Sequence, residues 1–247
     1  MTDWKYRFET EDLKVALTGV SDFFLLTVDW LSRTDCSRAF GCESARNLMN
    51  ATIHEKYQVP TLETERLRLR GPKPTDFPDS SALWSDPLVT RYTSRKPLSE
   101  EEVWGRLLRY IGHWTWMGFG YWVVEEKKTG RFAGEVGFSD WKREIKPSLQ
   151  GLPELGWVLA SRVHGQGYAT EAASAAIQWA HSRLLERTSS AGYGGLEIPI
   201  APEFRSARMT CIIHPKNVRS IRVAEKCGFK ELLRTTYLGE PTIVFVQ

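Results

Sequence analysis

Hydrophobic and polar residues alternate along residues 66–70, where Leu67 and Leu69 lie between arginines. Gly71 and Pro72 follow this run directly. Strict alternation predicts a strand with one buried face, and a Gly-Pro pair marks the turn that ends it. The first regular element that the pattern supports is therefore a half-buried strand.

Two stretches with helical spacing follow this strand. The first lies near residues 76–84. The second begins after Ser99, which forms a capping-box pattern with Glu102 three residues later. Beyond that cap, apolar residues recur at helical spacing, namely Val103, Leu107, Tyr110, Ile111 and Trp114.

In the middle of the chain, the hydrophobic pattern predicts a β-hairpin, followed by a strand and a long helix. The hairpin strands cover 121–126 and 131–139, with the turn at 128–130. A further strand falls within 153–160, and a helix starts a few residues later. One stripe of that helix is apolar and consists of Ala169, Ala172, Ala173, Ala176, Ile177, Ala180 and Leu184.

The last part of the chain begins with residues 187–204, which are rich in Gly, Pro and Ser and predict a loop insertion. A strand is expected within 206–215. A short helix follows, with Asn217 near its start and Gly228 just past its end. Two closing strands are expected around a turn at 239–241. This order predicts an α/β chain with an antiparallel hairpin in the middle and one strand–helix–strand crossover.

Composition narrows the class of protein. The 247 residues are 42% hydrophobic and 26% charged, as in soluble globular proteins. The formal net charge of +3 is too small to indicate a nucleic-acid or membrane partner. The most apolar stretch, 15–31, is interrupted by Asp22 and Asp29, so we expect no membrane span. The mixed, acidic segment before it is unlike a secretory signal, and we expect a cytoplasmic protein.

The chain divides near residue 60. Residues 1–60 have no clear period and no motif, and we treat them as an N-terminal extension of uncertain order. Residues 61–247 then form one domain that contains the 187–204 insertion. Four cysteines and five histidines are scattered without zinc-like spacing, so no metal site is expected.

The candidate chemistry starts at Gly165 and Gly167, which stand between a predicted strand and a predicted helix. The first turn of a helix has N–H groups without partners inside the helix, and the helix dipole adds partial positive charge there. Glycines let the backbone approach a ligand closely. These properties predict a phosphate or diphosphate site. The third glycine of a dinucleotide-binding turn and the Gly-Lys of a P-loop are both missing.

The pattern R-x-x-G-x-G-x-A, formed by Arg162, Gly165, Gly167 and Ala169, resembles the acyl-CoA pyrophosphate loop of the GNAT N-acetyltransferases. The preceding "PELGWVLA" resembles the fourth strand of that family. "TERLRLR" and "NVRSIRVAEKCGF" resemble the first strand and the Asn-x-x-Ser helix of its RimJ/RimL branch. The four matches occur in family order and extend over roughly residues 61–247.

The resemblance implies a fold and a co-substrate. The expected fold is a mixed, mostly antiparallel sheet of about seven strands, splayed in the middle and flanked by about four helices. The expected co-substrate is acetyl-CoA, with no metal. Its diphosphate would meet the backbone N–H groups of the loop, with an added contact from Arg162, and its pantetheine arm would pair with the edge of a strand. The residues implied for this binding are Trp157, Val158, Leu159, Arg162, Gly165, Gln166, Gly167, Tyr168, Ala169, Thr170 and Asn217.

The resemblance also implies catalytic candidates. Ser220 lies one helical turn after Asn217 and is the expected general acid for the leaving thiolate. Glu135 and Glu154 are the candidates for the base that takes the amine proton, directly or through water. Each glutamate is equally open to a role in orienting the substrate or in a salt bridge. The aromatic residues of 104–122 are mostly expected in the core, with part of them able to line the acceptor pocket.

The function predicted from these residues is transfer of an acetyl group from acetyl-CoA to a primary amine, by direct attack in a ternary complex. The acceptor is either a protein N-terminus or a small-molecule amine, and the protein is a monomer or a homodimer. Two alternatives stay open at this point. One is a non-catalytic acyl-CoA-binding or regulatory module of the same fold. The other is an adaptor that docks a partner through residues 1–60.

Overall fold

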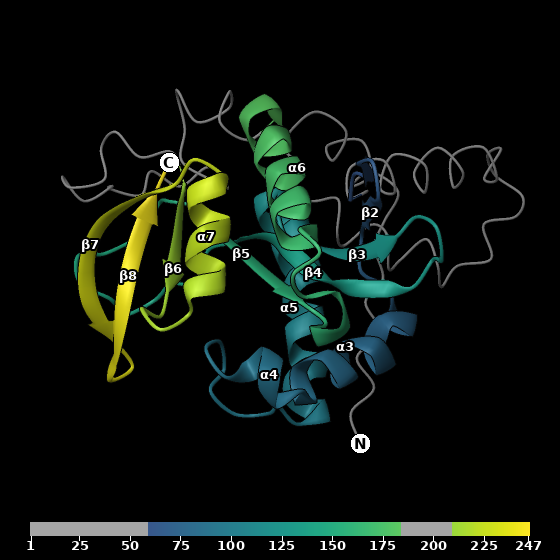
Figure 1. Cartoon of the computed structure of the whole chain (residues 1–247), viewed down its shortest axis with the longest axis horizontal. Coiled ribbons are helices and arrows are strands. Elements are labelled where there is room, and N and C mark those ends of the chain that lie inside the picture. The colour runs from purple at the N-terminus through teal and green to yellow at the C-terminus, as the bar shows by residue number, and fades with distance from the viewer. Residues whose placement is uncertain (1–58, 184–208) are drawn as a thin grey trace, which may run out of the picture. The chain divides into compact units, whose positions relative to one another are not determined.

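The computed structural model describes residues 59–183 and 209–247 (Figure 1). The predictions for the extension up to residue 58 and for the 187–204 insertion therefore lie outside the described residues. The first described residues are already bound to the rest of the domain, because the indole N–H of Trp122 donates to the carbonyl of Pro60 at 2.8 Å.

Eight strands form one sheet in the order β1-β2-β3-β4-β5-β6-β8-β7. Every pairing is antiparallel except that of β5 with β6, which is parallel. The strands are β1 (Leu62–Glu63), β2 (Leu67–Arg70), β3 (Tyr121–Glu126), β4 (Phe132–Ser139), β5 (Glu154–Leu159), β6 (Thr210–Ile213), β7 (Lys230–Tyr237) and β8 (Glu240–Val246).

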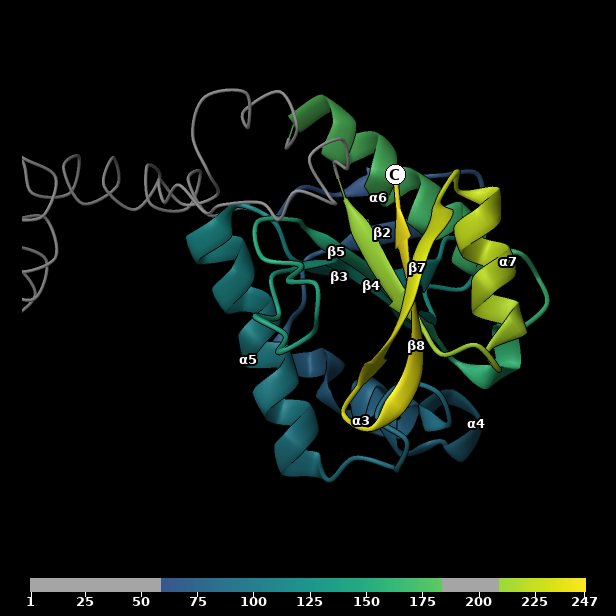
Figure 2. The ribbon, with the colours of Figure 1, turned by 90° about the vertical axis from the view of Figure 1, so that its left-hand side faces the viewer.

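Five α-helices and two 3-10 turns accompany the sheet in the described part of the chain. The helices are α3 (Phe77–Ser85), α4 (Pro87–Thr90), α5 (Glu100–Met117), α6 (Tyr168–Arg183) and α7 (Val218–Lys226), and the turns are η1 (Pro74–Asp76) and η2 (Ser161–Val163). Seen from the side, α6 and α7 lie on one side of the sheet, and α3 and α5 on the other (Figure 2).

Strand alternation explains this two-sided packing. Trp122, Val136 and Trp157 are register partners across β3, β4 and β5, and all belong to the core cluster that contains the alanines of α6. One residue along, Val158 faces the opposite side and packs with Trp84 of α3. Small alanines on α6 let that helix lie close to the sheet.

The sheet splays between β5 and β6. These strands share a single register pair, Glu154 with Thr210, and then diverge. The rest of the β5 edge that faces β6 therefore has no ladder partner among the described strands. This confirms the splayed sheet that the resemblance implied.

The hairpin, the long helix after it and the Ser99–Glu102 capping box are confirmed. The sheet has eight strands rather than about seven, because the two-residue β1 was not predicted. The spacing of apolar residues also did not predict the short helix α4. The closing turn lies earlier than predicted, at Leu238 and Gly239, whose φ angles are +51° and +79°. Ile111, one of the apolar residues at helical spacing in this helix, is 42% exposed.

Candidate active site

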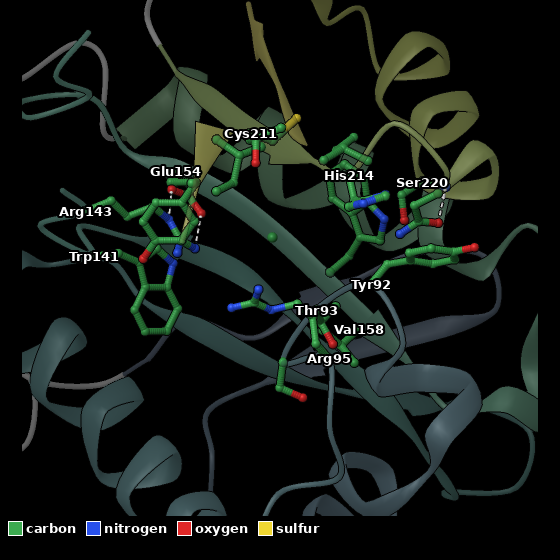
Figure 3. A pocket seen from close by; sticks show the side chains of 18 of the residues that line it. Tyr92, Thr93, Arg95, Trp141, Arg143, Glu154, Val158, Cys211, His214 and Ser220 are labelled. Atoms are coloured by element: carbon green, nitrogen blue, oxygen red, sulfur yellow. Dashed lines mark hydrogen bonds and ion pairs between the residues drawn. The ribbon is translucent and has the colours of Figure 1, made fainter. Parts of the chain in front are cut away.

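A cavity of about 440 Å³ opens where β5 and β6 diverge. Its walls come from α3, the segment after α4, α5, the start of β3, the loop between β4 and β5, β5, β6, the start of α7 and the β7–β8 turn. Figure 3 shows side chains from these segments around the cavity, among them Arg95, Trp141, Glu154, His214 and Ser220. The splay thus brings together residues that are more than a hundred positions apart in the chain.

The glycine turn leads from β5 into α6. Gly165 and Gly167 have φ angles of +80° and +82°, which glycine adopts without steric cost. Among the described residues, no acceptor takes the backbone N–H groups of Gly165, Gly167, Tyr168, Ala169 and Thr170. Gln166 differs, since its N–H donates to the carbonyl of Val163 at 3.4 Å. Free N–H groups at the start of a sixteen-residue helix suit an anion.

Arg66 holds this turn in place, a contact that the sequence did not reveal. Its guanidinium donates to the carbonyl of Gln166 at 2.9 Å and pairs with Glu171 in the first turn of α6 at 2.6 Å. It also lies 4.7 Å from the ring centre of Tyr168. Burial acts to raise the pKa of Glu171, but hydrogen bonds from Thr64 and Arg66 outweigh it and lower that pKa.

Arg162 was predicted to contact a diphosphate, but in the structure its side chain contacts the β3–β4 hairpin. Its guanidinium pairs with Glu126 at 2.6 Å and donates to the carbonyl of Phe132. Both partners belong to the β3–β4 hairpin, so Arg162 ties η2 to that hairpin. Because these two contacts hold the guanidinium against the hairpin, the geometry does not favour the diphosphate contact that the motif suggested.

Asn217 and Ser220 line the cavity from the start of α7. The side-chain oxygen of Asn217 accepts the backbone N–H of Ser220 at 3.3 Å, as expected of a helix N-cap. Its NH₂ group and the hydroxyl of Ser220 have no hydrogen-bond partner among the described residues. Both groups are therefore available to a ligand in the cavity.

Of the three β5 residues predicted to contact the pantetheine arm, two line the cavity and one does not. Trp157 and Val158 line the cavity along the open edge of β5. Leu159 does not line it, and its carbonyl contacts the ring of His164 at 2.9 Å. The part of β5 that lines the cavity therefore extends as far as Val158.

Glu135 is fully buried and does not line the cavity. Its carboxylate accepts hydrogen bonds from Ser80 at 2.8 Å, from the indole of Trp84 at 2.9 Å and from the hydroxyl of Tyr110 at 2.8 Å. This position does not favour the predicted general-base role, because the carboxylate is covered by three donors and does not reach the cavity. The strand pattern placed Glu135 on the correct strand, but it could not show which helices cover it.

Glu154 does line the cavity, at the start of β5. It accepts two hydrogen bonds from Arg143, both at 2.7 Å. A bidentate arginine favours the charged carboxylate and fixes its orientation. Of the two predicted base candidates, only Glu154 reaches the cavity.

Tyr121 is a cavity residue that the sequence placed with the aromatic core. It stacks on Tyr110 with ring centres 4.5 Å apart, and its hydroxyl lies over Gly156. A Cβ at Gly156 would lie 2.0 Å from that oxygen, so this glycine makes room for it. Burial, followed by the charge of Glu154, raises the pKa of Tyr121 above its usual value. The phenol therefore stays protonated and can donate a hydrogen bond into the cavity.

The described residues contain no group of His, Cys, Asp and Glu side chains arranged to hold a metal ion. None of the helices in that part of the chain combines the length and the apolar character that a membrane crossing requires.

The chain is similar in sequence to known proteins, among them two from Bacillus species. The chain is 30% identical over 171 residues to YkkB, an uncharacterized protein of Bacillus subtilis, and the match covers 68% of this chain and 83% of YkkB. It is 29% identical over 174 residues to the uncharacterized N-acetyltransferase p20 of Bacillus licheniformis, covering 70% and 84% of the two chains.

Solved structures agree as well. An acetyltransferase of Agrobacterium tumefaciens superposes with a TM-score of 0.56 at 26% identity, covering 77% of this chain and 95% of its own. The ribosomal L7/L12 α-N-protein acetyltransferase RimL, solved with coenzyme A, shares the fold at 15% identity, with a TM-score of 0.54 and coverage of 76% and 97%. The family model described as an acetyltransferase (GNAT) domain matches residues 66–230, and the chain therefore belongs to the GNAT acetyltransferase family.

Proposed function

We propose that this protein transfers an acetyl group from acetyl-CoA to a primary amine, by direct attack within a ternary complex. The observation that carries the proposal is the set of free backbone N–H groups at 165 and 167–170, next to a strand edge left open by the splay. A diphosphate at those N–H groups would place the rest of the coenzyme along the open edge of β5. That position leads directly into the cavity.

The residues present fit the co-substrate along its length. The N–H groups of Gly165, Gly167, Tyr168, Ala169 and Thr170 would bind the diphosphate, and Gln166 would hold the shape of the turn. The edge of β5 at Trp157 and Val158 would pair with the amides of the pantetheine arm, as an added strand does. The free NH₂ group of Asn217 would donate to the same arm.

The acetyl thioester supplies the electrophilic carbonyl, and the chain supplies position and proton control. Ser220 and Tyr121 both present hydroxyl groups to the cavity, and either can donate to the leaving sulfur. We assign this role to Ser220 because it adjoins Asn217, the proposed pantetheine contact. Glu154 would attract the ammonium form of the acceptor and accept its proton, directly or through water.

The raised thiol pKa of the cysteine in the cavity favours direct attack over an acyl-enzyme intermediate. Cys211 lines the cavity but is buried, and this burial, together with Glu154, raises the pKa of its thiol well above the usual value. A thiol needs to become a thiolate to act as a nucleophile. Transfer without a covalent intermediate requires no such group.

The test is release of the CoA thiol, followed with a thiol reagent, when acetyl-CoA is supplied with a panel of primary amines and short peptides with free N-termini. Amine-dependent release supports the proposal, and reactions without amine control for hydrolysis. Binding of acetyl-CoA without any release would support the alternative of a non-catalytic acyl-CoA-binding module. Calorimetry that shows no binding of acetyl-CoA to the folded protein would refute both.

A matched pair of variants tests the binding loop itself. Asn and Asp both tolerate positive φ, and a side chain at Gly165 would meet no atom within 4 Å, so Gly165→Asn and Gly165→Asp share their steric effect. They differ by one negative charge near the diphosphate. At about 6 Å and an effective dielectric constant of about 40, that charge is worth about 1.4 kcal/mol, a tenfold loss of affinity. Equal affinity of the two variants for acetyl-CoA would place the diphosphate elsewhere.

A further inference from the structure

We infer that the acceptor carries an anionic group, a carboxylate or a phosphate, in addition to its amine, and that Arg106 and Arg109 of α5 bind that group. The inference rests on the proposed function and deepens it by naming a substrate class. It starts from the charges that line the cavity and from the donors that they leave open.

Positive side chains outnumber negative ones in the cavity wall. The lining includes Arg95, Arg106, Arg109 and Arg143 against Glu154 and Glu240. The two glutamates are already engaged: Arg143 holds Glu154, and Arg95 lies 3.5 Å from Glu240. Within the described part of the chain, neither Arg106 nor Arg109 forms an ion pair. These two arginines are therefore the cations that the cavity leaves for a ligand.

Arg106 has a buried donor without an acceptor. Its guanidinium carbon lies 3.9 Å from the ring centre of Trp84, and its Nε has no hydrogen-bond partner although it is buried. Burial acts to lower the pKa of Arg106, but Tyr110 and then the charge of Glu135 outweigh it and raise that pKa. The Glu135 oxygens themselves accept from Ser80, Trp84 and Tyr110. An unmet N–H in such surroundings is costly. Arg106 lines the cavity, so an anionic ligand there would offer its guanidinium an acceptor.

Arg109 lies one helical turn further on, on the same face of α5, since residues three apart are neighbours on a helix. Its guanidinium carbon is 5.2 Å from the ring centre of Trp141, and those of Arg106 and Arg143 are 5.7 Å and 5.5 Å from it. Three cations therefore surround one indole. A guanidinium packed on an aromatic ring keeps its in-plane N–H fork free for a carboxylate or phosphate.

This group is separate from the loop proposed for the coenzyme diphosphate. Arg143 pairs with Glu154 at the amino end of β5, whereas the free N–H groups follow the carboxyl end of that strand. A six-residue strand is about 17 Å long at ~3.3 Å per residue. The diphosphate cannot occupy both places, so the arginines near Trp141 remain for the acceptor. The same cations would repel an acceptor with several positive charges.

The test uses acceptors that differ only in an anionic group: β-alanine against β-alaninamide, and O-phosphoethanolamine against ethanolamine. At saturating acetyl-CoA we expect kcat/KM to be at least tenfold higher for the anionic member, because it alone gains a charge-assisted contact with these arginines. Arg109→Gln and Arg106→Gln should reduce this ratio, because each lowers kcat/KM for the anionic member more than for the neutral member. Arg131→Gln is the matched control, because Arg131 is exposed at the far end of the β3–β4 hairpin.

A second readout does not depend on turnover. In arginine labelled with ¹⁵N, the Nε–Hε signals of Arg106 and Arg109 can be identified by their loss in the two Gln variants. With free CoA saturating the other site, titration with phosphate or succinate should shift these signals and leave that of Arg131 in place. Absence of a shift, or preference for the neutral acceptors, overturns the inference. If none of the amines is acetylated, the proposed function fails, and the titration alone then decides whether this cavity binds anions.

Discussion

Replacing Glu135 separates a structural role from a catalytic one. Its carboxylate accepts hydrogen bonds from three buried donors, on Ser80, Trp84 and Tyr110, and it also offsets the charge of Arg106. In Glu135→Ala the hydroxyl of Ser80 can rotate toward another acceptor, but the indole and the phenol lose theirs. Two orphaned donors at about 1–3 kcal/mol each, together with the space left by the side chain, give a loss of roughly 3–6 kcal/mol.

Glu135→Gln is expected to be much milder. An amide oxygen can take the position shared by Trp84 and Tyr110, and the amide NH₂ can donate to Ser80, so the hydrogen bonds survive while the charge is lost. We expect a loss of about 1–2 kcal/mol, the difference between charge-assisted and neutral bonds. If Glu135 were the general base, the same substitution would reduce kcat by about 10²–10⁴-fold.

Equilibrium unfolding in urea, followed by circular dichroism, measures the first effect, and CoA thiol release measures the second. Glu65→Ala is the control, because Glu65 is exposed and forms no hydrogen bond or ion pair in the described residues. We expect Glu135→Gln to retain kcat within a few-fold and Glu135→Ala to unfold at much lower urea. A stable Glu135→Gln variant with a hundredfold lower kcat would refute the structural role and restore the catalytic one.

Two further predictions concern Ser220 and Glu171. Ser220→Ala should lower kcat roughly tenfold to hundredfold and leave the Kd for acetyl-CoA within about twofold, because water can partly replace a general acid; unchanged kcat would remove Ser220 from the mechanism. The pKa of Glu171 is lowered in the folded protein from an ordinary value of 4.5, so its stabilising contribution is present above that value and is lost as the pH falls through the lowered pKa. The unfolding free energies of the wild-type protein and Glu171→Gln should differ at pH 7, and the difference should shrink as the pH falls below 4.5; a constant difference would contradict this account.

The sequence predicted the elements that depend on local pattern. The hairpin turn, the Ser99 cap and the apolar stripe of α6 each follow from residues within one or two turns of each other. The glycine turn was likewise predictable, because strand, Gly-x-Gly and helix follow directly along the chain. Its free N–H groups need no particular side chain, and a motif can therefore locate them.

The side-chain partners could not be predicted in this way. Arg162 stands in the motif that suggested a diphosphate contact, yet its guanidinium pairs with a hairpin some thirty residues earlier. Glu135 alternates correctly on its strand, but only tertiary packing shows that three donors cover its carboxylate. Tyr121 and Arg106 resemble core and surface residues in the sequence, and they become cavity residues only when α5 is laid across the sheet.

The single pair that joins β5 to β6 has a mechanical consequence. Strands β1 to β5 and strands β6 to β8 are each continuous ladders, whereas the seam between them depends on Glu154 and Thr210. A coenzyme arm bound along β5 would fill the place of a missing strand in that seam. Occupancy would then brace the two ladders against one another, and the carboxyl-terminal ladder would exchange its amide protons more slowly whenever the co-substrate is present.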